Sequence, residues 1–234
     1  MRLTMLLDAL PHKTVLGQAP ATVTGVASDS RKVMPGNVFV AVPGLKQDGR
    51  HYVGQALERG ATAVVVEGGD PLPASSTARI LVPSAREALA GMADAYFGHP
   101  SRALTVVGIT GTNGKTTTSL LANTLLAALG HTTGLIGTIE YRIGAEVRPA
   151  GQTTPEALEL QSLFAEMVAR GVSAVSMEVS SHALALARVD GVEFDVAVFT
   201  NLTQDHLDFH RTLESYRAAK ARLFALLAAG LKRG

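Results

Sequence analysis

Residues 104–117 read LTVVGITGTNGKTT, and this stretch decides the fold. Residues 104–110 are an apolar, β-branched run that predicts a buried strand, and residues 116–129 are a helical stretch that Gly130 would end. A glycine-rich turn between a strand and a helix is the setting of a phosphate-binding loop, because backbone N–H groups and the helix N-terminus attract phosphate oxygens. The stretch therefore predicts an α/β unit that binds a phosphate-bearing ligand.

The loop itself supplies candidate ligands for phosphate and metal. Lys115 is expected to reach the outer phosphates, and the Thr116 hydroxyl is expected to bind Mg²⁺. The common spacing G-x-x-x-x-G-K-[ST] requires glycine at the position of Ile109, so the loop is a variant, unlike that of an ordinary GTPase or motor protein. The alternative is a plain glycine-rich turn with a surface lysine. The residues expected to bind the nucleotide are Gly111, Thr112, Asn113, Gly114, Lys115, Thr116 and Thr117.

Strands and helices alternate along the whole chain. Strands are expected at 23–27, 37–42, 63–67, 79–82, 104–110, 135–139, 172–179 and 194–200. Helices are expected at 51–59, 85–97, 116–129, 155–169 and 213–228. The alternation predicts an α/β fold with a mostly parallel sheet covered on both faces, and with ligands near the carboxyl ends of its strands. The polar segment 98–101 is the expected link between a domain at 1–98 and a domain at 99–234.

Composition narrows the class of protein. A length of 234 residues, at about 150 per domain, indicates two modest domains or one large one. The 21 Lys and Arg against 20 Asp and Glu leave a net charge of +1, without the basic field of a dedicated nucleic-acid binder. The absence of Cys excludes disulfides, thiolate zinc sites and a cysteine nucleophile. No apolar run approaches the ~18 residues of a membrane span, and the N-terminus does not resemble a signal peptide, so a soluble, cytoplasmic protein is expected.

Several later residues carry chemistry that spacing alone leaves open. Glu178 ends a predicted strand near the phosphate loop, where it would hold a metal on nucleotide phosphates or pair with a surface cation. His206 and His210 have the i, i+4 spacing of a metal pair if they lie on a helix, but no glutamate follows His206, so a zinc protease site is not expected. A single imidazole or carboxylate at a Mg²⁺ site stays possible. By composition, Lys220 is an ordinary cation on an amphipathic helix.

Five motifs, taken together, resemble the Mur ligases. They are GTNGKTT at 111–117, TTP at 153–155, MEVSSH at 177–182, NLTQDHLD at 201–208 and YRAAK at 216–220. The likeness extends into the first hundred residues, where SDSR at 28–31, GNVFVA at 36–41 and DGR at 48–50 resemble the family's uridine-nucleotide domain. The motifs cover nearly the whole chain in the family's order. They most resemble the branch that adds the third residue to UDP-N-acetylmuramoyl-L-alanyl-D-glutamate in peptidoglycan synthesis, and hence in cell-wall biogenesis, cell shape and cell division.

The resemblance implies an ATP-dependent amide-forming ligase. Members phosphorylate a substrate carboxylate with ATP, and an amine then attacks the acyl phosphate, which supplies the leaving group that a carboxylate lacks. By motif match, Lys115 would stabilise the terminal phosphates, Thr116 and Glu178 would hold one Mg²⁺, and His206 would help to bind a second. Lys220 matches a lysine that carbon dioxide carbamylates, and its product would assist the second Mg²⁺. Lys115, His206 and Lys220 are therefore the catalytic candidates.

The resemblance also assigns residues to the UDP-muramyl precursor. The matching positions are Ser28, Ser30, Leu45, Lys46, Gln47, Thr153, Thr154, Ser180 and Arg188. Those before residue 50 would face uridine or lie beside it, and the later ones would contact the diphosphate, sugar or peptide. Two positions depart from the family pattern: Gln152 stands where some members have Asn, and Leu186 stands where some have Gln, so Leu186 is not assigned.

Three alternatives to this interpretation stay open. The first is another ligase branch of the same superfamily. The second is a module that only binds the UDP-precursor or ATP, and the third is a generic P-loop ATPase. The family's amino-acid-binding domain is a third domain, so we expect the 234 residues to be about half of a monomeric enzyme and not to complete the ligation alone. The identity of the added amino acid, whether meso-diaminopimelate, lysine or ornithine, does not follow from these residues.

Overall fold

The structure is a computed structural model that describes residues 1–44, 47–69 and 77–229. The chain divides into two compact units, Met1–Gly98 and His99–Gly234. Each unit has its own sheet and its own hydrophobic core. In the described ranges, no helix is both long enough and apolar enough to cross a membrane.

The first unit has a five-stranded sheet in the order β1-β5-β4-β3-β2. Its strands are β1 (Thr14–Leu16), β2 (Gly25–Ala27), β3 (Asn37–Ala41), β4 (Ala63–Glu67) and β5 (Ala78–Val82). Its helices are α1 (Leu3–Asp8), α2 (Val53–Glu58) and α3 (Ala85–Tyr96). Strands β2 to β5 run parallel, and β1 pairs with β5 in the antiparallel direction. The β4 residues 63–66 are completely buried, as expected of a parallel strand covered on both faces.

Two aspartates shape the carboxyl edge of this first sheet. Asp29 follows β2 and accepts the N–H of Arg31, and Asp48 follows β3 and accepts the N–H of Arg50. Each contact opens a short 3-10 turn, because an aspartate side chain readily caps the backbone two positions ahead. The two turns therefore hold the connecting loops over the edge at which β2 and β3 end.

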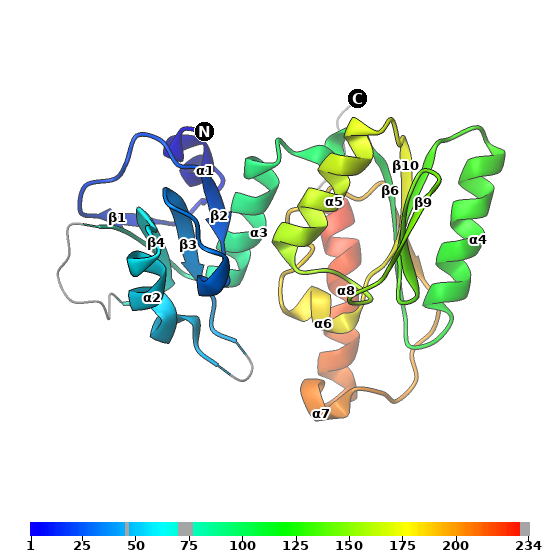
Figure 1. Ribbon diagram of the computed structural model, residues 1–234. Helices are drawn as coiled ribbons and strands as arrows, with labels where there is room; N and C mark the ends of the chain where they lie inside the picture. Colours follow the sequence, from blue (N-terminus) through cyan, green and yellow to red (C-terminus); the bar gives the residue numbers. More distant parts are fainter. Residues whose placement is uncertain (45–46, 70–76, 230–234) are drawn as a thin grey trace. The chain divides into compact units, whose positions relative to one another are not determined.

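The second unit has a six-stranded sheet in the order β11-β6-β10-β7-β8-β9. Its strands are β6 (Thr105–Thr110), β7 (Thr133–Ile136), β8 (Glu140–Ile143), β9 (Glu146–Pro149), β10 (Ala174–Glu178) and β11 (Val196–Phe199). Its helices are α4 (Lys115–Ala128), α5 (Ala157–Ala169), α6 (Ser181–Ala185), α7 (Leu207–His210) and α8 (Leu213–Ala229). Strands β11, β6, β10 and β7 are parallel, and β8 and β9 form an antiparallel hairpin. Helix α4 lies on one face of the sheet, and α5, α6 and α8 lie on the other (Figure 1).

The face under α5, α6 and α8 carries the hydrophobic core of the second unit. Leu160 and Phe164 of α5, Leu184 of α6 and Leu223 of α8 are completely buried, and Phe194 joins them just before β11. On α5 the apolar side chains recur at helical spacing, which gives this helix one buried face. Burial of that face is what fixes α5 against the sheet.

Helix α4 packs on the opposite face through polar groups. Its buried residues are Ser119 and Asn123. Asn123 Nδ2 donates to Gly134 O of β7 at 2.7 Å, and Ser176 Oγ of β10 donates to Ser119 O at 2.9 Å. Two of its leucines, Leu121 and Leu125, are 60% and 65% exposed, and Leu129 just after the helix is 77% exposed, whereas Leu120 and Leu126 are half-buried. Hydrogen bonds therefore join α4 to both β7 and β10.

The predicted fold class is confirmed, and the differences are local. Every predicted strand and helix is present; β4 has the predicted bounds and the others have shifted ends, such as the strand predicted at 135–139, which is β7 and begins and ends earlier. Elements α1, β1, α6, α7 and the β8–β9 hairpin were not predicted. The hairpin turns at Gly144, whose φ of +59° suits glycine. In the segment 98–101, Gly98 ends the first unit, whereas Ser101 is buried in the second and accepts the N–H of Glu193.

Phe164→Ala tests the core assignment of α5. The Phe164 ring is fully buried in the core, so we expect its loss to lower the free energy of unfolding by about 3–5 kcal/mol. Val168 lies on the same helix and is 36% exposed, so Val168→Ala is the matched control and is expected to cost less than about 1 kcal/mol. Urea unfolding followed by circular dichroism measures both. Equal costs for the two variants would contradict the assignment.

Candidate functional site

Four parallel strands of the second unit end at one edge of the sheet, and the residues after them surround one pocket. The phosphate loop follows β6, Thr138 follows β7, Glu178 ends β10, and His206 comes after β11. The pocket has a volume of about 250 Å³. It is lined by Thr112, Asn113, Gly114, Lys115, Thr116, Thr138, Thr153, Glu178, Ser180, Ser181, His206, Tyr216 and Lys220. This is the edge at which parallel α/β sheets bind ligands.

The phosphate loop requires glycine at two positions. Gly111 has a φ of +148° and Gly114 a φ of +84°, conformations that a residue with a Cβ rarely adopts. A Cβ on Gly111 would also lie 1.9 Å from Thr200 Oγ1, which is well inside contact distance. Gly114 is followed directly by α4, so the first N–H groups of that helix, which have no intrahelical acceptor, border the pocket. The loop therefore presents a helix N-terminus, which favours anions.

Glu178 lies beside that helix N-terminus and is only 1% exposed. Its Oε2 accepts the hydroxyls of Thr116 at 3.1 Å and Thr138 at 3.0 Å, and its Oε1 accepts the N–H of Thr138 at 2.8 Å. The Thr138 hydroxyl also lies 3.1 Å from the hydroxyl of Thr153. These contacts differ from the surface ion pair that was the alternative for Glu178. They hold one buried carboxylate beside the first turn of α4.

Two lysine amines meet at one carbonyl oxygen. Lys115 Nζ donates to Gly111 O and Thr112 O, each at 2.9 Å, so this side chain folds back onto its own loop. Lys220 Nζ donates to the same Gly111 O at 2.7 Å. The Lys220 side chain is 2% exposed, and its Nζ lies 4.4 Å from the centroid of the Tyr216 ring. A residue of α8 is thereby brought to a loop more than a hundred positions earlier in the sequence.

Burial changes the acid–base behaviour of both amines. Desolvation lowers the pKa of Lys115, against the opposing charges of Glu178 and Asp205. Desolvation also lowers the pKa of Lys220 to about 8; the charge of Lys115 acts in the same direction, and that of Asp205 opposes it. A substantial fraction of the Lys220 amine is therefore neutral near pH 8.

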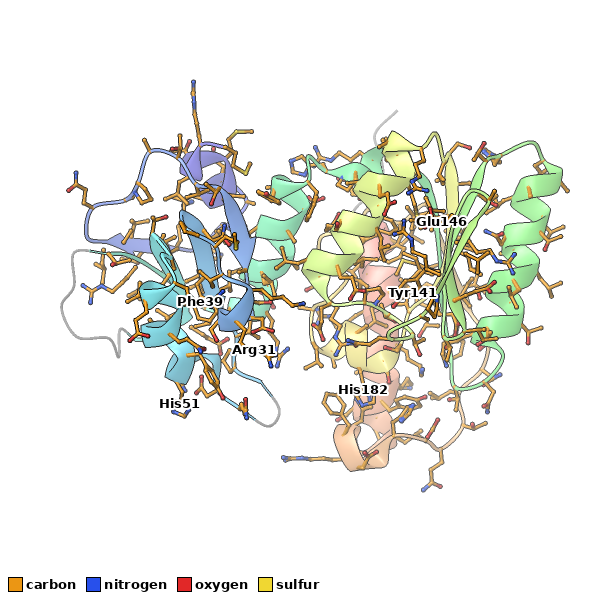
Figure 2. All side chains as sticks on the ribbon, in the orientation of Figure 1. Arg31, Phe39, His51, Tyr141, Glu146 and His182 are labelled. Atoms are coloured by element: carbon orange, nitrogen blue, oxygen red, sulfur yellow. The ribbon has the colours of Figure 1, made fainter. Side chains whose placement is uncertain are left out.

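The two histidines with i, i+4 spacing do not lie on one helix. His206 precedes α7 with a left-handed φ of +52°, and His210 ends α7 with its Nε2 2.9 Å from Ser181 Oγ. His182 lies between them, with ring centroids 5.0 Å from His206 and 5.5 Å from His210. Figure 2 shows His182 at the end of this unit, near α6 and α7. In residues 1–44, 47–69 and 77–229, no three His, Cys, Asp or Glu side chains are grouped as metal ligands.

A polar cluster behind the pocket links the end of β10 to the segment before α5. Thr154 Oγ1 donates to Glu178 O at 2.9 Å and accepts the N–H of Ser180 at 3.0 Å. Arg188 Nη1 donates to Gln152 Oε1 at 2.7 Å and to Thr154 O at 3.2 Å. The structure thus brings together Thr154, Ser180 and Arg188, three of the residues predicted to contact the precursor. Of these, only Ser180 lines the pocket.

The first unit has its own pocket, of about 490 Å³, at the carboxyl edge of its sheet. Its lining is Ser28, Asp29, Ser30, Arg31, Phe39, Val42, Gln47, Gly49, Tyr52 and Gln55. Ser30 Oγ donates to Gln55 Oε1 at 2.5 Å, and the Tyr52 hydroxyl donates to Gln47 Oε1 at 2.6 Å. The structure therefore places Ser28, Ser30 and Gln47 in one pocket. The other two residues predicted for this region, Leu45 and Lys46, lie outside the described residues.

Thr138, Ser181 and Tyr216 line the phosphate-loop pocket but were not predicted, and neither was Asn201, which contacts the loop beside it. Thr138 binds Glu178, Tyr216 places its hydroxyl 3.2 Å from Thr112 Oγ1, and Asn201 contacts the loop residue Asn113. Asn201 and Tyr216 begin two of the motifs that carry the family resemblance, which was the available signal. Thr138 had a weaker signal, since it follows a strand of the parallel sheet.

Comparison with known proteins gives matches over nearly the whole chain. Residues 109–231 match the family model described as the Mur ligase middle domain, and residues 22–97 match the one described as the Mur ligase family catalytic domain. A UDP-N-acetylmuramoyl-L-alanyl-D-glutamate--2,6-diaminopimelate ligase from Solibacter usitatus is 51% identical over 92% of this chain and 43% of its own length. The chain thus spans less than half the length of this relative.

Two solved structures extend the comparison. The structure of a UDP-N-acetylmuramoyl-L-alanyl-D-glutamate--2,6-diaminopimelate ligase matches with a TM-score of 0.77 and 31% identity, covering 94% of this chain and 44% of that one. The MurF ligase from Thermotoga maritima in complex with ADP matches with a TM-score of 0.53 and 25% identity, covering 87% of this chain and 43% of that one. Both likenesses include the phosphate-loop unit and the unit before it, since each covers most of the chain.

The pKa of Lys220 predicts how stability depends on pH. A lysine with a pKa of about 8 in the folded protein and 10.5 in the unfolded chain makes the unfolded state bind more protons between these two values. The free energy of unfolding should therefore rise as the pH increases from about 8 to 10.5, and Lys220 should contribute up to about 3 kcal/mol to this rise. Lys220→Met should flatten the rise, whereas Lys32→Met, which removes an exposed lysine, should not. Urea unfolding from pH 7 to 10.5 measures the free energy of unfolding. Parallel plots of that free energy against pH for wild type and Lys220→Met would contradict the prediction.

Proposed function

This chain belongs to the Mur ligase family, and on that premise we propose that it forms the uridine-nucleotide and phosphate-loop portion of an ATP-dependent ligase. The proposed reaction adds a diamino acid, as the third residue, to UDP-N-acetylmuramoyl-L-alanyl-D-glutamate in peptidoglycan synthesis. The support is the 51% identity to a relative whose name gives that substrate. Because the chain spans 43% of that relative, the ligation is proposed for a protein of the relative's length.

The observation that carries the proposal is the meeting of opposite charges at the edge of the second sheet. The amines of Lys115 and Lys220 meet at Gly111 O beside the N-terminus of α4, and the Glu178 carboxylate lies in the same pocket, 3.1 Å from the Thr116 hydroxyl of the first turn of α4. Phosphate groups are favoured by the helix terminus and by the lysines. A carboxylate in the same pocket suits the cation that accompanies a nucleotide.

The donor atoms beside Glu178 fit Mg²⁺. Glu178 Oε2 and Thr116 Oγ1 lie 3.1 Å apart, and carboxylate and hydroxyl oxygens are the hard ligands that Mg²⁺ prefers. We propose that these two residues would hold a Mg²⁺ ion bound with the nucleotide, which would supply positive charge to offset that of the transferring group. Lys115 is assigned to the outer phosphates, where a charged amine stabilises the developing charge. In the structure this amine donates hydrogen bonds to two carbonyl oxygens of its own loop, those of Gly111 and Thr112.

Lys220 and His206 are assigned to a second Mg²⁺. Carbamylation joins the neutral Lys220 amine to carbon dioxide through a new C–N bond and releases one proton, which leaves an anionic carbamate. The pKa of about 8 that burial gives Lys220 supplies the neutral amine that this step requires. His206 lines the same pocket, so its imidazole and the carbamate could share an ion with phosphate oxygens and water. Such an ion would reduce the repulsion between the substrate carboxylate and the γ-phosphate.

The precursor is assigned to both units. Ser28, Ser30 and Gln47 are proposed to face or adjoin uridine, since they share one pocket of the first unit. Leu45 and Lys46 are proposed beside them from the family match alone. The residues proposed for the diphosphate, sugar or peptide are Thr153, Thr154, Ser180 and Arg188. Their support is a chain of hydrogen bonds. Thr153 contacts Thr138, a partner of Glu178, and Thr154 contacts Glu178 O, Ser180 and Arg188.

A second candidate function is a binding module that holds ATP or the UDP-precursor without ligating it. The observation that favours it is the coverage, since the chain spans less than half of its relatives. For the 234-residue chain alone we propose this behaviour, with nucleotide or precursor binding and no amide product.

The ligase assignment predicts which precursor drives phosphate release. A protein of the relatives' length should release phosphate from ATP and Mg²⁺ only when UDP-N-acetylmuramoyl-L-alanyl-D-glutamate and a diamino acid are both present. The assay compares the dipeptide with the tripeptide precursor, and diaminopimelate with lysine and ornithine. Release driven by the tripeptide precursor would point to another branch of the superfamily, and precursor-independent hydrolysis to a generic ATPase.

Lys220→Ala, made in the same longer protein, tests the carbamate. Turnover should fall by about 10- to 100-fold, as for the loss of a group that tunes a metal site, and small carboxylates such as acetate should restore part of it. Arg217→Ala is the matched control, because Arg217 is exposed on the same helix. Unchanged turnover in Lys220→Ala, or a fall that no small carboxylate reverses, would remove the carbamate from the proposal.

A further inference from the structure

The chain stays beside the phosphate loop after β11 ends. The ladder between β6 and β11 finishes at the pair Thr110 and Phe199, but Thr200 N still donates to Thr110 O at 3.0 Å. One residue later, Asn201 O accepts the N–H of Thr112 at 2.9 Å. The backbone pairing of the two strands therefore continues into the loop for a short distance, although the loop itself is not a strand.

At the next loop residue, the contact with the loop is made by the Asn201 side chain instead of the backbone. Asn201 Oδ1 accepts the N–H of Asn113 at 3.0 Å, and Asn201 Nδ2 donates to Asn113 O at 3.1 Å. One amide thus satisfies both main-chain groups of one loop residue. Only one orientation of the Asn201 amide allows this, because its oxygen must meet the N–H and its NH₂ must meet the carbonyl.

The neighbouring hydroxyl strengthens the same contact. Thr200 Oγ1 donates to Asn113 O at 2.7 Å, so this carbonyl receives two donors. Asn113 precedes Gly114 and the first turn of α4, whose N–H groups border the pocket. A loop that is already held in its binding conformation loses less conformational entropy when a ligand arrives, and so binds more tightly.

We propose that Asn201 is a positioning residue of the phosphate site: its side-chain amide fixes Asn113, and through it the loop, in the conformation that receives the phosphates of a nucleoside diphosphate or triphosphate. Asn201 itself does not touch the phosphates. Its role follows from the paired contacts with Asn113, and it rests on the proposed function for the identity of the ligand. The role of Asn201 does not depend on the assignment of residues to Mg²⁺.

The test uses the 234-residue chain and ADP as the probe. Asn201→Ala should raise the Kd for ADP, measured by titration calorimetry, by about 5- to 30-fold, the equivalent of two lost hydrogen bonds. The same variant should speed hydrogen exchange of the loop peptide around residues 111–117 without ADP present. Gln204→Ala is the matched control: Gln204 is exposed in the same segment, and this variant should change the Kd by less than about twofold.

The two readouts separate this inference from the proposed function. If Asn201→Ala and Gln204→Ala give the same loop exchange and the same ADP affinity, Asn201 does not position the loop, even if its loss lowers the melting temperature. If the wild-type chain binds no ADP, the proposed nucleotide is wrong, and the comparison of loop exchange alone then decides whether Asn201 fixes Asn113. Slower or unchanged exchange in Asn201→Ala would overturn the inference in either case.

Discussion

The site in the second unit depends on how closely the chain after β6 approaches the chain after β11. Gly111 has no side chain, and the space that a Cβ would need is taken by Thr200 Oγ1. This approach leaves the Gly111 carbonyl as the shared acceptor of Lys115 and Lys220. Burial lowers the pKa of both amines, and repulsion by the charge of Lys115 lowers the pKa of Lys220 further. An anion entering the pocket would relieve that repulsion.

The order of the strands explains why the groups meet there. Strand β10 comes late in the sequence but lies between β6 and β7, so Glu178 lies at a strand end directly beside the phosphate loop. On the other side of β6, β11 brings Thr200 and Asn201 to the same loop. In a parallel sheet all these carboxyl ends share one edge, and each neighbouring strand contributes a different chemical group to it.

The sequence predicted what local rules determine and missed what distant contacts determine. The strand, loop and helix at 104–129 follow from periodicity and glycine placement, and Glu178 follows from the parallel-sheet rule. The partners of the loop do not, because Tyr216 meets Thr112 only after α8 has packed on the sheet. The β8–β9 hairpin was missed although its residues alternate around Gly144, a signal that the helical α/β pattern on either side obscured.

The polar face of α4 has a consequence for how accurately the site is built. Apolar contacts lack direction, so a helix held only by them can shift along its axis at little cost, whereas hydrogen bonds such as that from Asn123 to Gly134 O fix one axial position. Ser176 adds a second such attachment on the neighbouring strand. Thr116 is in the first turn of this helix and Glu178 ends β10. The two hydrogen bonds therefore help to set the distance between Thr116 Oγ1 and Glu178 Oε2 by fixing the main chain, independently of any ligand.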